Sequence, residues 1–135
     1  MKSIAVSLLI LSLISSVLAG EPSQGSAIFN NDNLSDIDQR QVKRFLMGKD
    51  FKWEDGRPVI IAYQTQDNAT QYIQSLTGLT LEEFETLWKQ LRAEGARPLK
   101  RFSNRGALVA FVGLNPGALG IVAKVETDDL VKVAQ

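Results

Sequence analysis

The chain has 135 residues, in which 15 lysines and arginines balance 15 aspartates and glutamates, and it contains neither cysteine nor histidine. The balanced charge gives no long-range attraction to nucleic acid or to anionic lipid. Without histidine and cysteine, the chain lacks the commonest general base, the most reactive nucleophile, the usual zinc ligands and any disulfide. This composition favours a non-catalytic protein without a metal or cofactor.

The first nineteen residues have the pattern of a secretory signal peptide. Lys2 supplies a positive charge, residues 4–18 are mostly apolar, and Val17 and Ala19 stand three residues and one residue before a cleavage point. The apolar run is shorter than the roughly 20 residues that a membrane-spanning helix requires. We therefore expect cleavage after Ala19, and the mature chain then has no membrane anchor. An exported chain without disulfides indicates a bacterial, periplasmic protein.

The mature chain of 116 residues has the size of one domain and can bury a hydrophobic core. We divide it into a lead-in with a first strand, residues 20–33, and a folded domain, residues 34–135. The first strand is expected at 26–30. The first helix is predicted to begin with Ser35 as its N-cap and to stop at Gly48.

Strands and helices alternate through the middle of the chain. An apolar, β-branched strand is expected over 59–63, followed by a helix from about residue 67 to Gly78. The strongest helix signal is the capping box of Thr80 and Glu83, in which each side chain accepts the other residue's backbone N–H. The apolar face of this third helix comprises Leu81, Phe84, Leu87, Trp88 and Leu91.

The last part of the chain completes the alternation. After a linking stretch at 97–102, a fourth helix is predicted from a Ser103 N-cap to about Leu114. Strands are expected at 119–125 and 130–133. Alternating strands and helices indicate an α/β domain with a mixed, mostly parallel sheet flanked by helices.

The glycine-rich segment 113–122 allows two interpretations, a phosphate-binding loop or a turn. Asn115-Pro116-Gly117 has turn chemistry, because proline presets its φ and glycine supplies a positive φ. Gly120 allows close packing at the start of a strand. A phosphate-binding loop runs from a strand into a helix N-terminus, whereas here a helix precedes the turn. We therefore interpret the segment as structural.

Three groups of residues occur in a distinctive order. They are Phe45-Leu46-Met47-Gly48-Lys49 with Trp53 and Asp55-Gly56, then Trp88 with Gly95-Ala96-Arg97-Pro98, then Pro116-Gly117-Ala118-Leu119-Gly120. This arrangement, over about 34–125, resembles the second lobe of the periplasmic phosphate-binding proteins that serve ABC transporters. Two-lobed members of that family are far longer than this chain. The resemblance implies a single lobe of a type 2 periplasmic-binding-protein-like fold.

The resemblance places an anion site where the strand at 59–63 meets the next helix. The free amides and the dipole of a helix N-terminus attract anions. The family has a Ser-Gly-Thr string at this helix start and an arginine just before it. Asn68-Ala69-Thr70 aligns with that string, with only the threonine identical, and residues 62–66 carry no positive charge. The candidate ligand-binding residues are Thr65, Asp67, Asn68 and Thr70. In the alternative interpretation, Asp67 or Asn68 only caps the helix.

The resemblance implies weak recognition of phosphate or another small anion, or an accessory role with an envelope transporter or sensor. A single lobe lacks the donors of the opposite lobe, so a second copy or another protein would have to supply that wall. The alternative is a protein–protein interaction module that kept the fold without the small-molecule site. Lys100-Arg101 beside Phe102 is interpreted as a solvated linker and not as a nucleic-acid contact, because the chain has no basic excess.

Overall fold

The structure is a computed structural model that describes residues 25–30, 32, 36–126 and 131–135. The helices are α2 (Gln39–Leu46), α3 (Asp67–Thr77), α4 (Leu81–Leu91), the 3-10 turn η1 (Arg92–Glu94) and α5 (Arg105–Leu114). The strands are β1 (Ser26–Asn30), β2 (Ile60–Gln64), β3 (Lys100–Phe102), β4 (Ala118–Val122) and β5 (Val131–Val133). The expected signal peptide lies outside the described residues. Within them, no helix has both the length and the apolar character needed to cross a bilayer.

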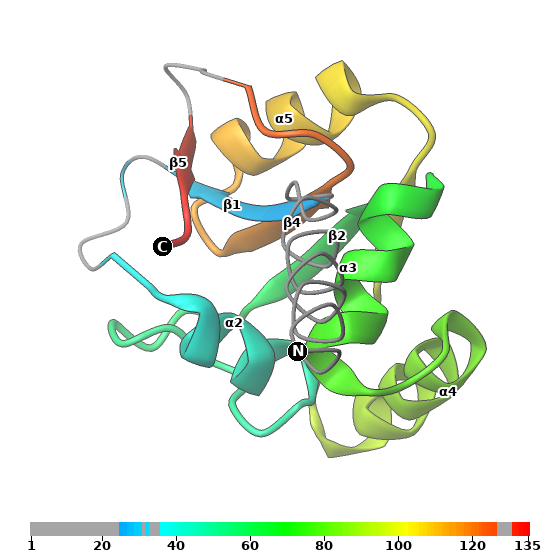
Figure 1. Ribbon diagram of the computed structural model, residues 1–135. Coiled ribbons are helices and arrows are strands. Elements are labelled where there is room, and N and C mark those ends of the chain that lie inside the picture. Colours follow the sequence, from blue (N-terminus) through cyan, green and yellow to red (C-terminus); the bar gives the residue numbers. More distant parts are fainter. Residues whose placement is uncertain (1–24, 31, 33–35, 127–130) are drawn as a thin grey trace, which may run out of the picture.

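The five strands form one sheet in the order β3-β2-β4-β1-β5 (Figure 1). Strand β2 runs parallel to β3 and to β4, whereas β1 runs antiparallel to β4 and to β5. The predicted α/β class and mixed sheet are confirmed. Parallel pairing joins two of the four neighbouring strand pairs, which is less than the mostly parallel sheet that we expected.

Helices cover both faces of the sheet (Figure 1). Helix α5 covers one face with Leu108, Val109 and Val112, which belong to a buried cluster with residues of β1, β2 and β4. Helices α2, α3 and α4 cover the other face and enclose a larger cluster. Because α3 follows β2 and α5 follows β3, the connections from these two neighbouring strands leave toward opposite faces.

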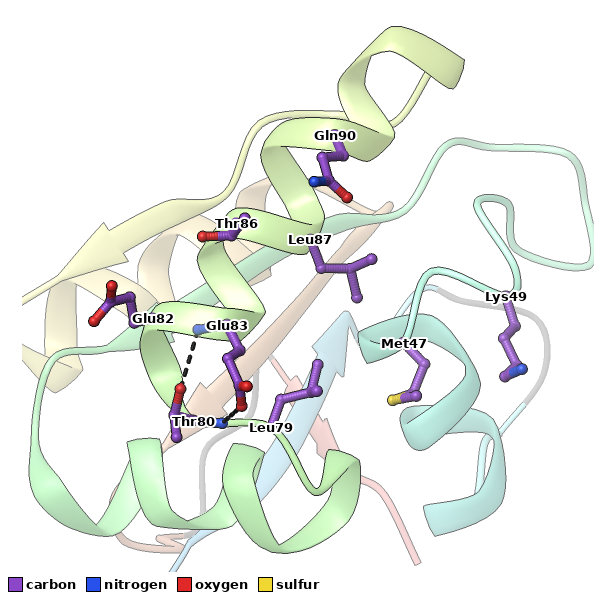
Figure 2. Close-up of a pocket in the computed structure, with 9 residues that line it drawn as sticks. All are labelled: Met47, Lys49, Leu79, Thr80, Glu82, Glu83, Thr86, Leu87 and Gln90. Atoms are coloured by element: carbon purple, nitrogen blue, oxygen red, sulfur yellow. Dashed lines mark hydrogen bonds between the residues drawn. The ribbon is translucent and has the colours of Figure 1, made fainter.

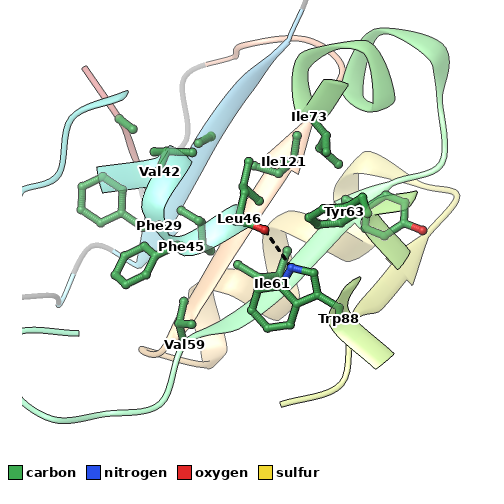
Figure 3. Close-up of a cluster of buried hydrophobic side chains, with 14 of the residues drawn as sticks. Phe29, Val42, Phe45, Leu46, Val59, Ile61, Tyr63, Ile73, Trp88 and Ile121 are labelled. Atoms are coloured by element: carbon green, nitrogen blue, oxygen red, sulfur yellow. Dashed lines mark hydrogen bonds between the residues drawn. The ribbon is translucent and has the colours of Figure 1, made fainter. Parts of the chain in front are cut away.

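The larger cluster contains two buried indole groups that are fixed by hydrogen bonds. Trp88 Nε1 donates to the backbone oxygen of Leu46 at 2.8 Å (Figure 3), and Trp53 Nε1 donates to that of Gly117 at 2.8 Å. An unsatisfied buried N–H costs about 1–3 kcal/mol. These bonds therefore fix where α4 meets the end of α2, and where the loop before β2 meets the start of β4.

Helix α4 confirms the predicted capping box. The Glu83 N–H donates to Thr80 Oγ1 at 3.1 Å, and the Thr80 N–H donates to Glu83 Oε1 at 2.9 Å. The predicted apolar face is also present, with Phe84, Trp88 and Leu91 buried and Leu81 and Leu87 packed partly buried against the same cluster. Local sequence signals therefore account for both the start and the orientation of this helix.

Two helix starts and one linking stretch differ from the prediction. Helix α2 is capped by Asp38 and not by Ser35, which lies outside the described residues, and α5 is capped by Asn104 and not by Ser103. In each case the side-chain Oδ1 accepts a backbone N–H three residues later, at 3.0 Å. Aspartate and asparagine cap helices as well as serine does, so nearby candidates compete.

The predicted linking stretch 97–102 contains β3, which is held by its pairing with β2.

The glycine-rich segment after α5 is a turn into β4, and the Ala118 N–H donates to the Asn115 oxygen at 2.9 Å. The positive φ expected for Gly117 is wrong, because this residue is not among the glycines with positive φ. Glycine is needed there for close approach. A Cβ would lie 2.5 Å from the Pro58 oxygen, and the Gly117 oxygen accepts the Ile60 N–H at 2.9 Å.

Gly120 lies in the middle of β4 and not at the strand start that we expected, but the expected close packing is present and provides a test. A Cβ at this position would lie 2.7 Å from Leu108 Cδ2 and 2.8 Å from Val112 Cγ2. Overfilling a packed core costs about 1–3 kcal/mol, so we expect Gly120→Ala to lower the free energy of unfolding by about 2 kcal/mol in urea titrations. In a Val112→Ala background the same change should cost less. An equal cost in both backgrounds would contradict this packing account.

Candidate functional site

The carboxyl ends of β2 and β3 lie at the same edge of the sheet, and the connections that follow them diverge. Strand β2 leads into α3 on one face, and β3 leads into α5 on the other. In open α/β sheets, ligands bind in the crevice outside the carboxyl ends of strands whose connections diverge in this way. The predicted candidate residues, 65–70, lie at this edge. The topology and the resemblance thus indicate the same place.

The start of α3 has no side-chain cap. Gln66 occupies the N-cap position and makes no capping hydrogen bond, so the interpretation that Asp67 or Asn68 caps the helix is wrong. Within the part of the chain that the structure describes, the N–H groups of Asp67, Asn68 and Ala69 have no acceptor. Gln66, Asp67 and Asn68 are exposed and line a hollow of about 440 Å³. This first turn keeps the free donors through which helix N-termini bind anions.

The two threonines of the predicted site direct their hydroxyls to protein acceptors. Thr65 donates to the Phe102 oxygen through its backbone N–H at 2.8 Å and through Oγ1 at 3.4 Å. Thr70 Oγ1 donates to the Asp67 oxygen at 3.1 Å, within the same helix. Thr65 therefore ties the start of α3 to the end of β3, whereas Asp67 and Asn68 remain exposed to solvent.

Arg105 is the cation that begins α5, and it was not predicted from the sequence to lie at this edge. Its Nε donates to the Lys124 oxygen at 3.3 Å, Nη2 donates to the Glu126 oxygen at 3.4 Å, and Nη1 pairs with the Glu126 carboxylate at 3.2 Å. These contacts hold the segment after β4 against the start of α5. The guanidinium is therefore engaged with the protein and stabilises the edge without offering a free charge.

Gln64 is a second residue of this edge that is not among the predicted site residues. Its side chain is buried, and its Oε1 accepts the Ala123 N–H at 3.0 Å, where β4 has just ended. The bond fixes the end of β2 against the residue that follows β4, which ends at Val122 and not at the predicted residue 125. A glutamine that ends an otherwise apolar strand was the available sequence signal.

Another hollow, of about 650 Å³, lies between α4 and the end of α2 (Figure 2). Met47, Leu79 and Leu87 are the apolar residues among its lining, and Glu82 and Glu83 are the acidic ones. Glu83 is engaged in the capping box and has a structural role. No group of three or more acidic side chains in the described ranges is arranged to hold a metal ion.

Comparison with solved structures finds a similar fold in three proteins that are named for phosphate binding or transport. A protein from Clostridium perfringens, assigned as a phosphate ABC transporter substrate-binding protein and solved with bound phosphate, matches with a TM-score of 0.60 and 18% identity. An ABC-type phosphate transport receptor from Vibrio cholerae matches with a TM-score of 0.62 and 17% identity. A protein from Planctomyces limnophilus, assigned as phosphate-binding, matches with a TM-score of 0.56 and 15% identity.

These matches cover 82–83% of this chain but only 40–45% of the matched chains. The chain has the fold of one part of a phosphate-transport receptor. The resemblance inferred from the sequence is thus confirmed at the level of fold, and its assignment to the second lobe stays a prediction. No family model matches the chain, and no curated protein sequence matches it.

The hydrogen bond of Gln64 provides a test of how the edge is held. Gln64→Leu keeps the approximate volume but leaves the Ala123 N–H without its acceptor, which should lower the free energy of unfolding by about 1–3 kcal/mol. Gln66→Leu is the matched control, because the side chain of Gln66 is exposed and makes no capping bond. Urea unfolding of both variants measures the difference. Equal stability of the two variants would show that the Gln64 bond does not hold the edge.

Proposed function

We propose that this protein is an exported, non-catalytic binding domain that recognises phosphate or a similar small anion weakly at the first turn of α3. The observation that carries the proposal is the uncapped start of α3, at the edge where the connections of β2 and β3 diverge. Free amides and a helix dipole favour an anion there. The likeness in fold to a receptor that was solved with bound phosphate supports the choice of anion.

The affinity of the isolated domain is expected to be low for three reasons. A single lobe offers donors from one side only, Asp67 adds a negative charge beside the amides, and Arg105 is engaged with Glu126. Each hydrogen bond to a charged group contributes roughly 1.5–3 kcal/mol, so the loss of three costs roughly 4–9 kcal/mol. That loss corresponds to about three to six decades in Kd.

A partner that covers the carboxyl edge would restore part of this affinity. We infer that the partner is an envelope transporter, a sensor or a second copy of this chain, and that the site works in the periplasm after cleavage near Ala19. The composition supports a non-catalytic role, because the chain has no histidine, the commonest general base, and no cysteine, the most reactive nucleophile. The similar solved structures are named as binding proteins and receptors.

The charge of Asp67 gives a direct test of anion recognition. A like charge about 5 Å away in a watery site costs about 1 kcal/mol, so Asp67→Asn should tighten phosphate binding about three- to fivefold. The amide resonances of residues 67–69, followed during a phosphate titration at constant ionic strength, report the Kd. Asp32→Asn makes the same charge change just after β1. Because β1 is antiparallel to β4, Asp32 follows a strand that ends at the opposite edge of the sheet from the first turn of α3, and the Kd should stay unchanged. An equal effect of both changes would contradict a local site.

The second candidate function is a protein–protein interaction module that kept the fold. The hollow at the start of α3 favours this alternative, because it is lined by Gln66, Asp67 and Asn68. None of these described residues is a cation that could bind an anion. Even a site with a millimolar Kd is mostly filled at about 10 mM anion. If phosphate, sulfate and arsenate at this concentration shift no amide resonance of the unmodified protein or of Asp67→Asn, the interaction module is the better description.

A further inference from the structure

A differently built pocket lies between α4, η1 and the segment that leads into β3. Its volume is about 210 Å³. The residues that line it are Glu85, Trp88, Lys89, Arg92, Pro98, Leu99 and Arg101. The pocket includes the amino end of β3, whereas the first turn of α3 follows the carboxyl end of β2. The two places share no residue.

The periodicity of α4 brings its polar lining residues to one side. Glu85 and Lys89 of α4 and Arg92, the first residue of η1, are spaced by four and three residues, which places them on one helical face. Trp88 closes the inner wall of the pocket, but its side chain is only 1% exposed and its indole N–H is bonded to the Leu46 oxygen. Pro98, which is exposed, supplies apolar surface that a ligand can reach. Leu99 packs against the same core cluster and adds apolar surface from the other side.

The one carboxylate of the pocket is engaged with the protein. The Tyr63 O–H donates to Glu85 Oε2, and Arg101 Nη1 pairs with the same oxygen at 3.2 Å. Burial, together with the adjacent Glu85, raises the pKa of the Tyr63 phenol, so this group keeps its proton and remains a donor. Glu85 is therefore held toward Tyr63 and Arg101, and it makes no ion pair with Lys89 one turn further along α4.

The pocket is lined by three cationic side chains, Lys89, Arg92 and Arg101, and by one acidic side chain, Glu85. Lys89 and Arg92 form no ion pair with any residue in the described part of the chain, although the whole sequence is balanced in charge. An adjoining hollow of about 600 Å³ shares Arg92 and Pro98 with this pocket, and its other charged lining residues are Lys52, Arg97 and Glu94. Cations grouped around a concave apolar wall concentrate positive potential and attract anions.

We propose that this pocket binds a small organic oxyanion, with a carboxylate or phosphate head group at Lys89 and Arg92 and a compact apolar body against Pro98 and Leu99. Its volume is that of about seven water molecules and is below the roughly 300 Å³ of pockets for drug-sized ligands. A molecule of the size of benzoate fits this volume. Inorganic phosphate alone leaves the apolar surface uncovered and binds less tightly.

Benzoate and phenyl phosphate are suitable probes, because the chain has two tryptophans and hence two indole N–H resonances. Trp53→Phe assigns the two signals in ¹⁵N-labelled protein. At constant ionic strength, both probes should shift the Trp88 resonance saturably and leave the Trp53 resonance in place. Benzyl alcohol, which is neutral, should shift it far less. A Trp88 resonance that does not move at about 10 mM probe overturns the proposal.

Charge variants separate a built pocket from general attraction. Lys89→Gln with Arg92→Gln should weaken both probes at least about fivefold, because two exposed charge contacts are lost. Arg40→Gln with Lys43→Gln removes the same charge from exposed positions on α2 and should keep the affinity. An equal loss in the two double variants overturns the proposal.

Asp67→Asn distinguishes this pocket from the anion site at α3. It should leave binding of benzoate and phenyl phosphate at Trp88 unchanged, since Asp67 does not line the pocket. If Asp67→Asn alters both the Trp88 shift and the shifts of residues 67–69, the two places are one site and the proposal of a separate pocket is overturned. The two proposals can therefore fail independently.

Discussion

The parallel pairing of β2 with a neighbour on each side is the constraint on which the rest of the molecule depends. Parallel neighbours cannot be joined by a tight turn, so each connection must cross over the sheet and includes at least one helix. The crossover from β2 to β3 contains α3 and α4, and the crossover from β3 to β4 contains α5 on the opposite face. The two-sided core and the divergence at the start of α3 are both results of this one arrangement.

Elements with local signals could be predicted from the sequence, and elements held by distant contacts could not. The capping box of Thr80 and Glu83 is local, and α4 begins where it predicts. Strand β3 is short and charged, and its extended form depends on β2, which lies more than thirty residues earlier in the chain. Gly117 shows the same limit, since the turn was predicted but the need for glycine comes from contact with Pro58.

The candidate site could be located from the sequence but not described. The resemblance and the helix signals led to the junction of β2 and α3. The direction of the Thr65 hydroxyl depends on the Phe102 oxygen, which no local pattern reveals. The pocket beside Trp88 was not visible either, because it joins a face of α4 to residues before β3, and the carboxylate of Glu85 is held by Tyr63, 22 residues earlier.

Strand β3 ends the sheet, and this position matters for a chain with the fold of less than half of a larger receptor. An open strand edge is a template on which other chains can add, and proteins avoid this with short edges and cationic side chains. Here the edge is only three residues long, and Lys100 and Arg101 occupy two of them. Mutual repulsion between such edges would hinder two copies of this domain from joining their sheets through β3.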